Sequence, residues 1–195
     1  MANETVFELT EPLDMHLHLR DADMLKLVGP LTSNTFSGAL IMPNLVPPVT
    51  TKEALLSYKD RIKDACKDDN FEPFVTLFFK NDYSYEFLED IKKDIIGIKL
   101  YPAGITTNSE TGVSSMDVEN LRPTLESMSK LGIPLCIHGE TNGFVMDREK
   151  EFMPIYEAIA KAFPRLKIIM EHITTKDAIE LLDKYDNLYA TVTLH

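Results

Sequence analysis

The segment Leu13-Asp14-Met15-His16-Leu17-His18-Leu19-Arg20 carries two histidines, one residue apart, inside a short apolar run. Side chains of a β-strand alternate between its two faces, so His16 and His18 point the same way, about 7 Å apart along the strand. Two imidazoles at that separation can bind one ion. The segment therefore predicts a strand that carries half of a metal site.

Two further histidines end apolar runs of similar character. His138 follows residues 133–137, and His172 follows closely on residues 166–170. A single histidine at a strand end is most often a core or loop residue. Four histidines in one kind of place favour a metal site instead, because zinc binds imidazole nitrogen readily and a catalytic zinc site needs several such ligands.

Short apolar runs alternate with helical patterns along the whole chain, which predicts an α/β fold with a parallel sheet. The expected strands are residues 13–18, 38–42, 73–79, 95–101, 134–138, 166–172 and 188–193, with a small extra strand at 6–9. The expected helices are residues 23–31, 51–66, 84–93, 117–131, 148–163 and 175–185, several with a Ser, Thr or Asp near the start as a cap.

Either a closed barrel or an open doubly wound sheet is compatible with this order. Polar residues end four different strands, and an eightfold barrel collects its site from the carboxyl ends of many strands. A TIM-type (β/α)8 barrel is therefore favoured, with about seven of its eight strands present. We expect residues 1–195 to form one barrel domain that is incomplete at its C-terminus.

Composition narrows the class of protein. The chain has 195 residues, 44% of them hydrophobic, and a net charge of −11 without a dense Lys/Arg cluster, so nucleic acid is not an expected partner. There is no apolar stretch of about 18 residues and no signal-peptide pattern at the start, so we expect a cytoplasmic protein without a membrane partner. Cys66 and Cys136 are too few for a disulfide framework.

Lys99 ends the apolar run at residues 95–98, where a buried ammonium costs several kcal/mol. One interpretation is a lysine whose ammonium reaches the solvent at the strand end. The other is that burial lowers its pKa, so that the neutral amine reacts with carbon dioxide to give a carbamate that bridges two metal ions. The nearby histidines make the second interpretation coherent.

Two polar residues follow the first two strands. Arg20 comes directly after the histidine pair, and Asn44 lies just beyond the second strand. An arginine fork and an amide can share one carboxylate, which suggests a small anionic substrate, although surface solubility and turn chemistry are the simpler readings. Residues 104–112 are small and polar and are typical of a mobile loop or a plain connection.

Four ordered motifs then resemble the short, single-function dihydroorotases of the amidohydrolase superfamily. The motifs are His16-Leu17-His18-Leu19-Arg20-Asp21, Met42-Pro43-Asn44-Leu45 with Pro47-Pro48-Val49-Thr50-Thr51, Lys99-Leu100-Tyr101-Pro102-Ala103 with Thr106-Thr107-Asn108-Ser109, and Glu171-His172-Ile173-Thr174-Thr175-Lys176. The resemblance runs over essentially the whole chain, with matching intervals between the motifs.

The resemblance implies a barrel enzyme of de novo pyrimidine biosynthesis that interconverts N-carbamoyl-L-aspartate and L-dihydroorotate. It assigns two zinc ions per subunit: His16 and His18 hold one, His138 and His172 hold the other, and Nζ-carboxylated Lys99 bridges both together with a hydroxide that acts as nucleophile. It places the substrate carboxylate on Arg20 and Asn44, and it places Thr106 and Thr107 on a loop over the ring. Family analogy also implies a homodimer.

The family pattern also calls for an acid–base aspartate after an eighth strand, and no such aspartate is found before residue 195. We therefore expect no catalytic acid or base within this chain, and we expect a fragment of a longer polypeptide or a chain completed by another. His195 matches no ligand position. The alternatives are another cyclic amidase, such as a hydantoinase or allantoinase, or a non-catalytic dihydroorotase-like scaffold that binds a partner enzyme.

Overall fold

Residues 8–193 are described by a computed structural model, in which seven strands alternate with six helices. The strands are β1 (Leu13–Leu17), β2 (Gly38–Ile41), β3 (Glu72–Phe78), β4 (Gly97–Leu100), β5 (Leu135–Ile137), β6 (Ile168–Met170) and β7 (Leu188–Ala190). The helices are α1 (Ala22–Ser33), α2 (Lys52–Ala65), α3 (Tyr85–Ile91), α4 (Val118–Leu131), α5 (Arg148–Ala162) and α6 (Lys176–Leu182).

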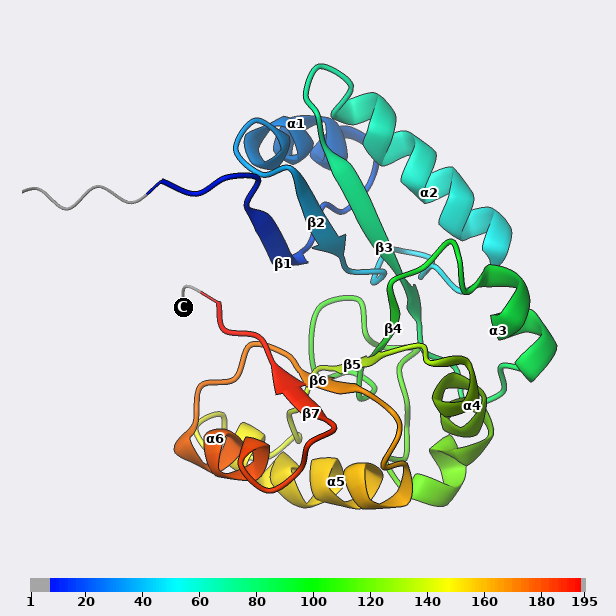
Figure 1. Cartoon of the computed structure of the whole chain (residues 1–195), viewed down its shortest axis with the longest axis vertical. Helices are drawn as coiled ribbons and strands as arrows, with labels where there is room; N and C mark the ends of the chain where they lie inside the picture. The colour runs from blue at the N-terminus through cyan, green and yellow to red at the C-terminus, as the bar shows by residue number, and fades with distance from the viewer. Residues whose placement is uncertain (1–7, 194–195) are drawn as a thin grey trace, which may run out of the picture.

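The strands form one sheet in the order β1 to β7, and every neighbouring pair is parallel. A doubly wound sheet reverses its strand order at a switch point, and this order never reverses. The sheet curls, with the helices arranged along its outer side (Figure 1). The prediction of a barrel-type α/β fold with seven strands is therefore confirmed, and β1 and β7 are the two edges.

Several boundaries differ from the sequence-based expectation. Most strands are shorter than their apolar runs, because only the paired residues form the ladder; β7 ends at Ala190, whereas we expected residue 193. Residues 8 and 9 are not in a strand, and the rest of the extra strand expected at 6–9 lies outside the described residues, as does His195. The expected caps are confirmed at the starts of five helices, where side chains accept backbone N–H groups: Asp21, Thr51, Ser84, Asp117 and Thr175.

The two faces of the sheet bury different residues. On the outer face, side chains such as Ile41 and Ile98 join the large core formed with the helices. On the inner face, Cys136 packs in a small cluster with Leu40, Met42 and Ile169. Lys99 pairs with Cys136 in the ladder, and paired residues point to the same face. The ladder therefore directs Lys99 into the interior of the curled sheet.

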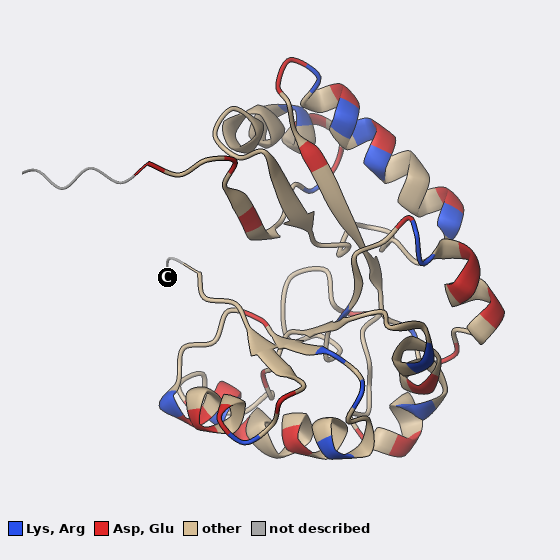
Figure 2. Ribbon diagram, viewed as in Figure 1, with Lys and Arg blue, Asp and Glu red and all other residues tan. Residues whose placement is uncertain are grey.

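Charged residues lie mainly on the outer helices, where Lys/Arg and Asp/Glu are intermingled (Figure 2). Within residues 8–193, no helix is both long and apolar enough to cross a membrane.

Candidate metal centre

The four predicted histidines lie at the carboxyl ends of three strands. His16 is within β1 and His18 follows it by one residue, whereas His138 follows β5 and His172 follows β6. Backbone hydrogen bonds hold the last two in place: the His138 N–H donates to the Leu100 carbonyl (3.0 Å), and the His172 N–H donates to Thr191 Oγ1 (2.8 Å). The sheet therefore brings together residues up to 156 positions apart, from 16 to 172.

The imidazoles approach one another in two pairs. His16 Nε2 lies 3.2 Å from His18 Nε2, and His138 Nδ1 lies 3.0 Å from His172 Nε2. The pairs are neighbours, since the ring centroids of His16 and His172 are 5.1 Å apart. Two nitrogens that share a tetrahedral zinc ion lie about 3.3 Å apart, so each pair has a spacing that suits one ion.

Two imidazoles alone do not complete a zinc site. Among residues 8–193, no group of three or more His, Cys, Asp or Glu side chains is arranged to hold a metal ion. A third protein ligand for either pair must therefore be of another residue type or come from a rearranged side chain. Lys99, directed toward the same interior, is the residue of another type that the sequence singled out.

The histidines line a pocket of about 400 Å³ at this end of the sheet. Its lining residues are His16, His18, Tyr101, Thr106, His138, Glu140, His172 and Thr193. A pocket of this size suits a small molecule, and its lining combines aromatic and polar groups, as small-molecule sites do.

Burial keeps most of these imidazoles neutral. Desolvation lowers the pKa of His18 and of His138 to about 3, with nearby positive groups adding to the effect. It lowers the pKa of His172 to about 4 by the same cause. Metal binding requires the neutral imidazole, so these residues have their ring lone pairs free for a metal near neutral pH.

Lys99 is completely buried, and its Nζ has no hydrogen-bond partner. The amine lies 5.3 Å from the centroid of the Tyr101 ring. Desolvation lowers the pKa of Lys99, although the carboxylate of Glu171 opposes the shift. An unpartnered buried amine is costly in a structure, so Lys99 fits a group that gains a ligand or a modification at this position.

Lys99 belongs to a wider set of unpartnered polar atoms. Among the buried side-chain atoms of residues 8–193, five nitrogen or oxygen atoms lack a hydrogen-bond partner: Arg20 Nη1, Lys99 Nζ, Tyr101 Oη, His138 Nε2 and Glu171 Oε1. All five belong to residues at the carboxyl ends of β1, β4, β5 and β6. Buried polar atoms are normally satisfied, so their concentration here indicates a site prepared for a ligand.

Asn44 is buried and is engaged at both ends of its amide. Its Oδ1 accepts from His18 Nδ1 (2.9 Å), and its Nδ2 donates to the Thr107 carbonyl (2.8 Å). Asn108 Nδ2 in turn donates to the Asn44 carbonyl (3.1 Å). The loop predicted at residues 104–112 is therefore attached to the histidine centre through Asn44. Thr106 lines the pocket, whereas the Thr107 side chain is exposed.

Two site residues adopt a backbone conformation that side chains other than glycine disfavour. Arg20 has a φ of 58° and His172 has a φ of 46°. Left-handed backbone at such residues costs about 1–3 kcal/mol and persists where the surroundings enforce it. His172 lines the pocket, and Arg20 follows the histidine pair of β1; such strain is commonly concentrated at functional sites.

The sequence did not assign a role to Glu171 or to Tyr101, although each lies within a quoted motif. Tyr101 lines the histidine pocket, and Glu171 contacts one of its histidines. Glu171 Oε2 accepts from His16 Nδ1 at 2.7 Å, and its side chain is fully buried. Burial raises the pKa of this carboxyl, but Lys99 and His16 outweigh it and lower the pKa to about 2. The signal that could have found Glu171 is a carboxylate that directly follows a buried apolar strand.

Comparisons with known proteins show what the chain as a whole is similar to. The amidohydrolase family profile matches residues 59–195. The chain is 48% identical over 189 residues to a dihydroorotase of Helicobacter hepaticus, covering 96% of this chain and 55% of that protein. The resemblance predicted from the four motifs is thus confirmed, and the chain spans about half the length of the relatives it matches.

Two solved dihydroorotase structures are similar to this chain in fold and in sequence. A dihydroorotase from Campylobacter jejuni superposes with a TM-score of 0.93 at 65% identity, covering 95% of this chain and 54% of that one. A dihydroorotase from Saccharomyces cerevisiae, solved in complex with 5-fluoroorotic acid, gives a TM-score of 0.84 at 31% identity, with coverages of 93% and 55%. The curled seven-stranded sheet and its helices therefore correspond to about half of each of these two dihydroorotase chains.

Proposed function

The chain belongs to the amidohydrolase family, and on that premise we propose that it acts as a zinc-dependent dihydroorotase. The reaction is the reversible interconversion of N-carbamoyl-L-aspartate and L-dihydroorotate in pyrimidine biosynthesis. One observation carries the proposal. Two pairs of imidazoles meet at the carboxyl end of the sheet, and the fully buried, unpartnered amine of Lys99 points to the interior of the same sheet. A protein without metal chemistry has no evident use for that combination.

The donor set fits two zinc ions. His16 and His18 would hold one ion, and His138 and His172 the other, because each pair presents two nitrogens at a suitable separation. When bound, such a pair of ions polarises an amide carbonyl and lowers the pKa of water.

Lys99 is the proposed link between the two pairs. Its neutral Nζ would add carbon dioxide, forming an N–C bond and releasing one proton, to give a carbamate. The carbamate would supply two oxygens and a negative charge where the buried amine has no partner. Burial favours this reaction because it lowers the pKa of Lys99 and so raises the share of neutral, nucleophilic amine.

Substrate binding is proposed for four further residues. Arg20 Nη1 is buried without a partner and would donate to the substrate carboxylate. Asn44 is proposed for the same carboxylate, which must then share the amide with His18 or Thr107. Thr106 and Thr107 belong to the loop beside the pocket and would close over the ring. The acid–base role stays with the aspartate that the family pattern places after an eighth strand.

Zinc content tests the proposal directly. The purified chain would be loaded with zinc, desalted and measured for bound metal, with Lys99→Ala and Lys59→Ala beside it. Lys59 is the matched control, because it forms a surface ion pair with Glu72 (2.9 Å) away from the histidines. We expect about two zinc ions in the wild type and in Lys59→Ala, and fewer than one in Lys99→Ala. Dihydroorotate hydrolysis would then be assayed on the loaded samples.

The outcomes distinguish the alternatives. Folded wild type without zinc would mean that the metal site needs the eighth strand or that the chain is a non-catalytic scaffold, and the same measurement on the longer polypeptide would separate the two. Zinc binding combined with turnover of hydantoin or allantoin, but not dihydroorotate, would favour another cyclic amidase. By the family resemblance we also propose a cytoplasmic location and a homodimer. Sedimentation analysis at several protein concentrations would check the dimer.

A further inference from the structure

The carboxylate of Glu171 connects strand β1 with the residue that follows strand β7, although these two strands do not pair with each other. Glu171 follows β6 and is buried, and Oε2 accepts from His16 Nδ1 in β1 at 2.7 Å. The same oxygen accepts from Thr191 Oγ1, just beyond β7, at 2.6 Å. Strands β1 and β7 are the two edges of the sheet. One carboxylate oxygen therefore joins both edges at the end of the sheet where the histidines lie.

Thr191 is held in a single orientation by its neighbours. Its hydroxyl accepts from the His172 N–H (2.8 Å) and donates to Glu171. Its own N–H donates to the Met170 carbonyl (3.0 Å), and its carbonyl accepts from the Ile173 N–H (3.0 Å). The hydroxyl is therefore fixed by backbone on both sides, so the hydrogen bond to Glu171 needs little further ordering of the side chain.

This chain of hydrogen bonds determines which nitrogen of His16 carries the proton. An ionised carboxylate only accepts, so His16 Nδ1 must be the N–H that donates to Glu171. His16 Nε2 then presents its lone pair, and it lies 3.2 Å from His18 Nε2. Carboxylates that fix the tautomer and ring orientation of a ligating histidine are a common part of metal sites.

We propose that Thr191 and Glu171 form a positioning relay that orients His16 for metal binding and ties the β7 edge of the sheet to the β1 edge. The inference rests on the proposed zinc site for its function. It assigns Glu171 and Thr191 as positioning residues, since they act through His16 and not on the substrate.

Four variants test the relay. Glu171→Gln keeps the size of the side chain but adds a donor and removes the charge, whereas Thr191→Val removes the hydroxyl and keeps the shape. Thr191→Ser restores the hydroxyl. The matched control is Glu149→Gln, because Glu149 also accepts several hydrogen bonds near the end of β6, from Thr174 and Thr175, but contacts no histidine.

Two readouts are needed. Zinc affinity, measured by competition with a chelator, should fall about 10–100-fold in Glu171→Gln, less in Thr191→Val, and little in Thr191→Ser or Glu149→Gln. Nitrogen NMR of the metal-free chain should show His16 protonated at Nδ1 in the wild type and a mixture of tautomers in Glu171→Gln.

The two readouts separate failure of the relay from failure of the proposed function. Folded Glu171→Gln and Thr191→Val with wild-type zinc affinity and an unchanged tautomer would overturn the relay. If the wild type binds no zinc, the proposed function fails, and the tautomer measurement still decides whether Glu171 orients His16. If Glu171→Gln does not fold, zinc affinity and the His16 tautomer are compared between Thr191→Val and Thr191→Ser instead.

Discussion

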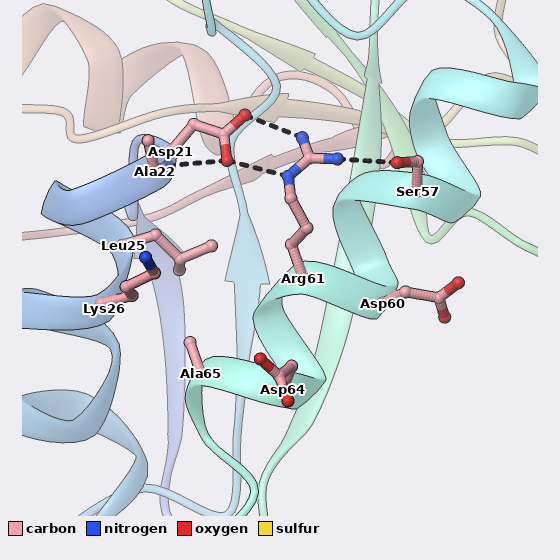
Figure 3. Close-up of a pocket in the computed structure, with 9 residues that line it drawn as sticks. All are labelled: Asp21, Ala22, Leu25, Lys26, Ser57, Asp60, Arg61, Asp64 and Ala65. Atoms are coloured by element: carbon pink, nitrogen blue, oxygen red, sulfur yellow. Dashed lines mark hydrogen bonds and ion pairs between the residues drawn. The ribbon is translucent and has the colours of Figure 1, made fainter.

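Two pockets of this protein differ in the state of their polar atoms. The larger, about 600 Å³, lies between α1 and α2 and is lined by charged residues (Figure 3). There Arg61 Nε and Nη2 donate to the two oxygens of Asp21 at 2.8 and 2.7 Å, and Arg61 Nη1 donates to Ser57. The histidine pocket is smaller, about 400 Å³, and is surrounded by buried polar atoms without partners.

The two pockets differ in whether their polar groups are satisfied within the protein, and this difference follows neither volume nor charge. In the α1–α2 pocket, each charge of the Asp21–Arg61 pair is satisfied within the protein and partly hydrated. In the histidine pocket, burial has removed water without supplying every partner, so binding a ligand recovers interactions that folding left unmade. Four predictions test this contrast, from the largest expected effect to the smallest.

Asn44→Ala should destabilise the protein by about 2–4 kcal/mol, because it removes two hydrogen bonds from a buried amide and leaves His18 and the Thr107 carbonyl unpaired. Chemical denaturation of the metal-free chain measures the effect. Asn120→Ala is the matched control: Asn120 also makes two side-chain hydrogen bonds, to Ser115 and Asn81, but at the surface. Equal losses in the two variants would show that burial does not decide the cost of removing such an amide.

Lys99→Met should raise the free energy of unfolding of the metal-free chain by about 1–3 kcal/mol, since it replaces a buried, unpartnered amine with an apolar chain of similar length. Zinc binding should be lost in the same variant. Lys59→Met, at a surface ion pair, should change neither quantity appreciably. A Lys99→Met protein that is less stable than the wild type would show that the amine has a partner in solution.

Glu149→Gln should cost roughly 1–2 kcal/mol at neutral pH, because Glu149 accepts hydrogen bonds from Thr174 and Thr175 at the start of α6. Burial raises the pKa of Glu149, but these hydrogen bonds outweigh it and lower the pKa below its ordinary value. The stabilisation is therefore complete above about pH 4.5 and is lost as pH falls through the folded-state pKa. Denaturation midpoints of wild type and variant should converge in acid; a constant gap would refute the assignment.

Arg61→Met should cost less than about 1 kcal/mol, because the Asp21–Arg61 pair is partly exposed and the charges rehydrate when the pair is broken. Zinc content should stay at the wild-type level. High salt should reduce the stability difference further by screening the pair. A loss of zinc in this variant would mean that the α1–α2 pocket is coupled to the histidine centre after all.

The fold was predictable because local pattern and global architecture agree. The alternation of apolar runs with capped helices predicts parallel βα units, and polar residues at the ends of several runs predict a shared edge of the sheet. His16 and His18 were predictable as a pair because they belong to one strand. The strand ends were less predictable, since the ladder stops where pairing stops and not where the apolar run stops, as at β7.

The sequence by itself determined the residue types of the candidate site and the strands that carry them, because side-chain chemistry and strand periodicity are local properties. Only the tertiary structure decided which groups meet. The pairing of His138 with His172, the attachment of Asn44 to Thr107 and the contact of Glu171 with His16 all join residues far apart in the chain. Their distances depend on how seven strands twist and curl together, and that is set by packing of the whole sheet against its helices.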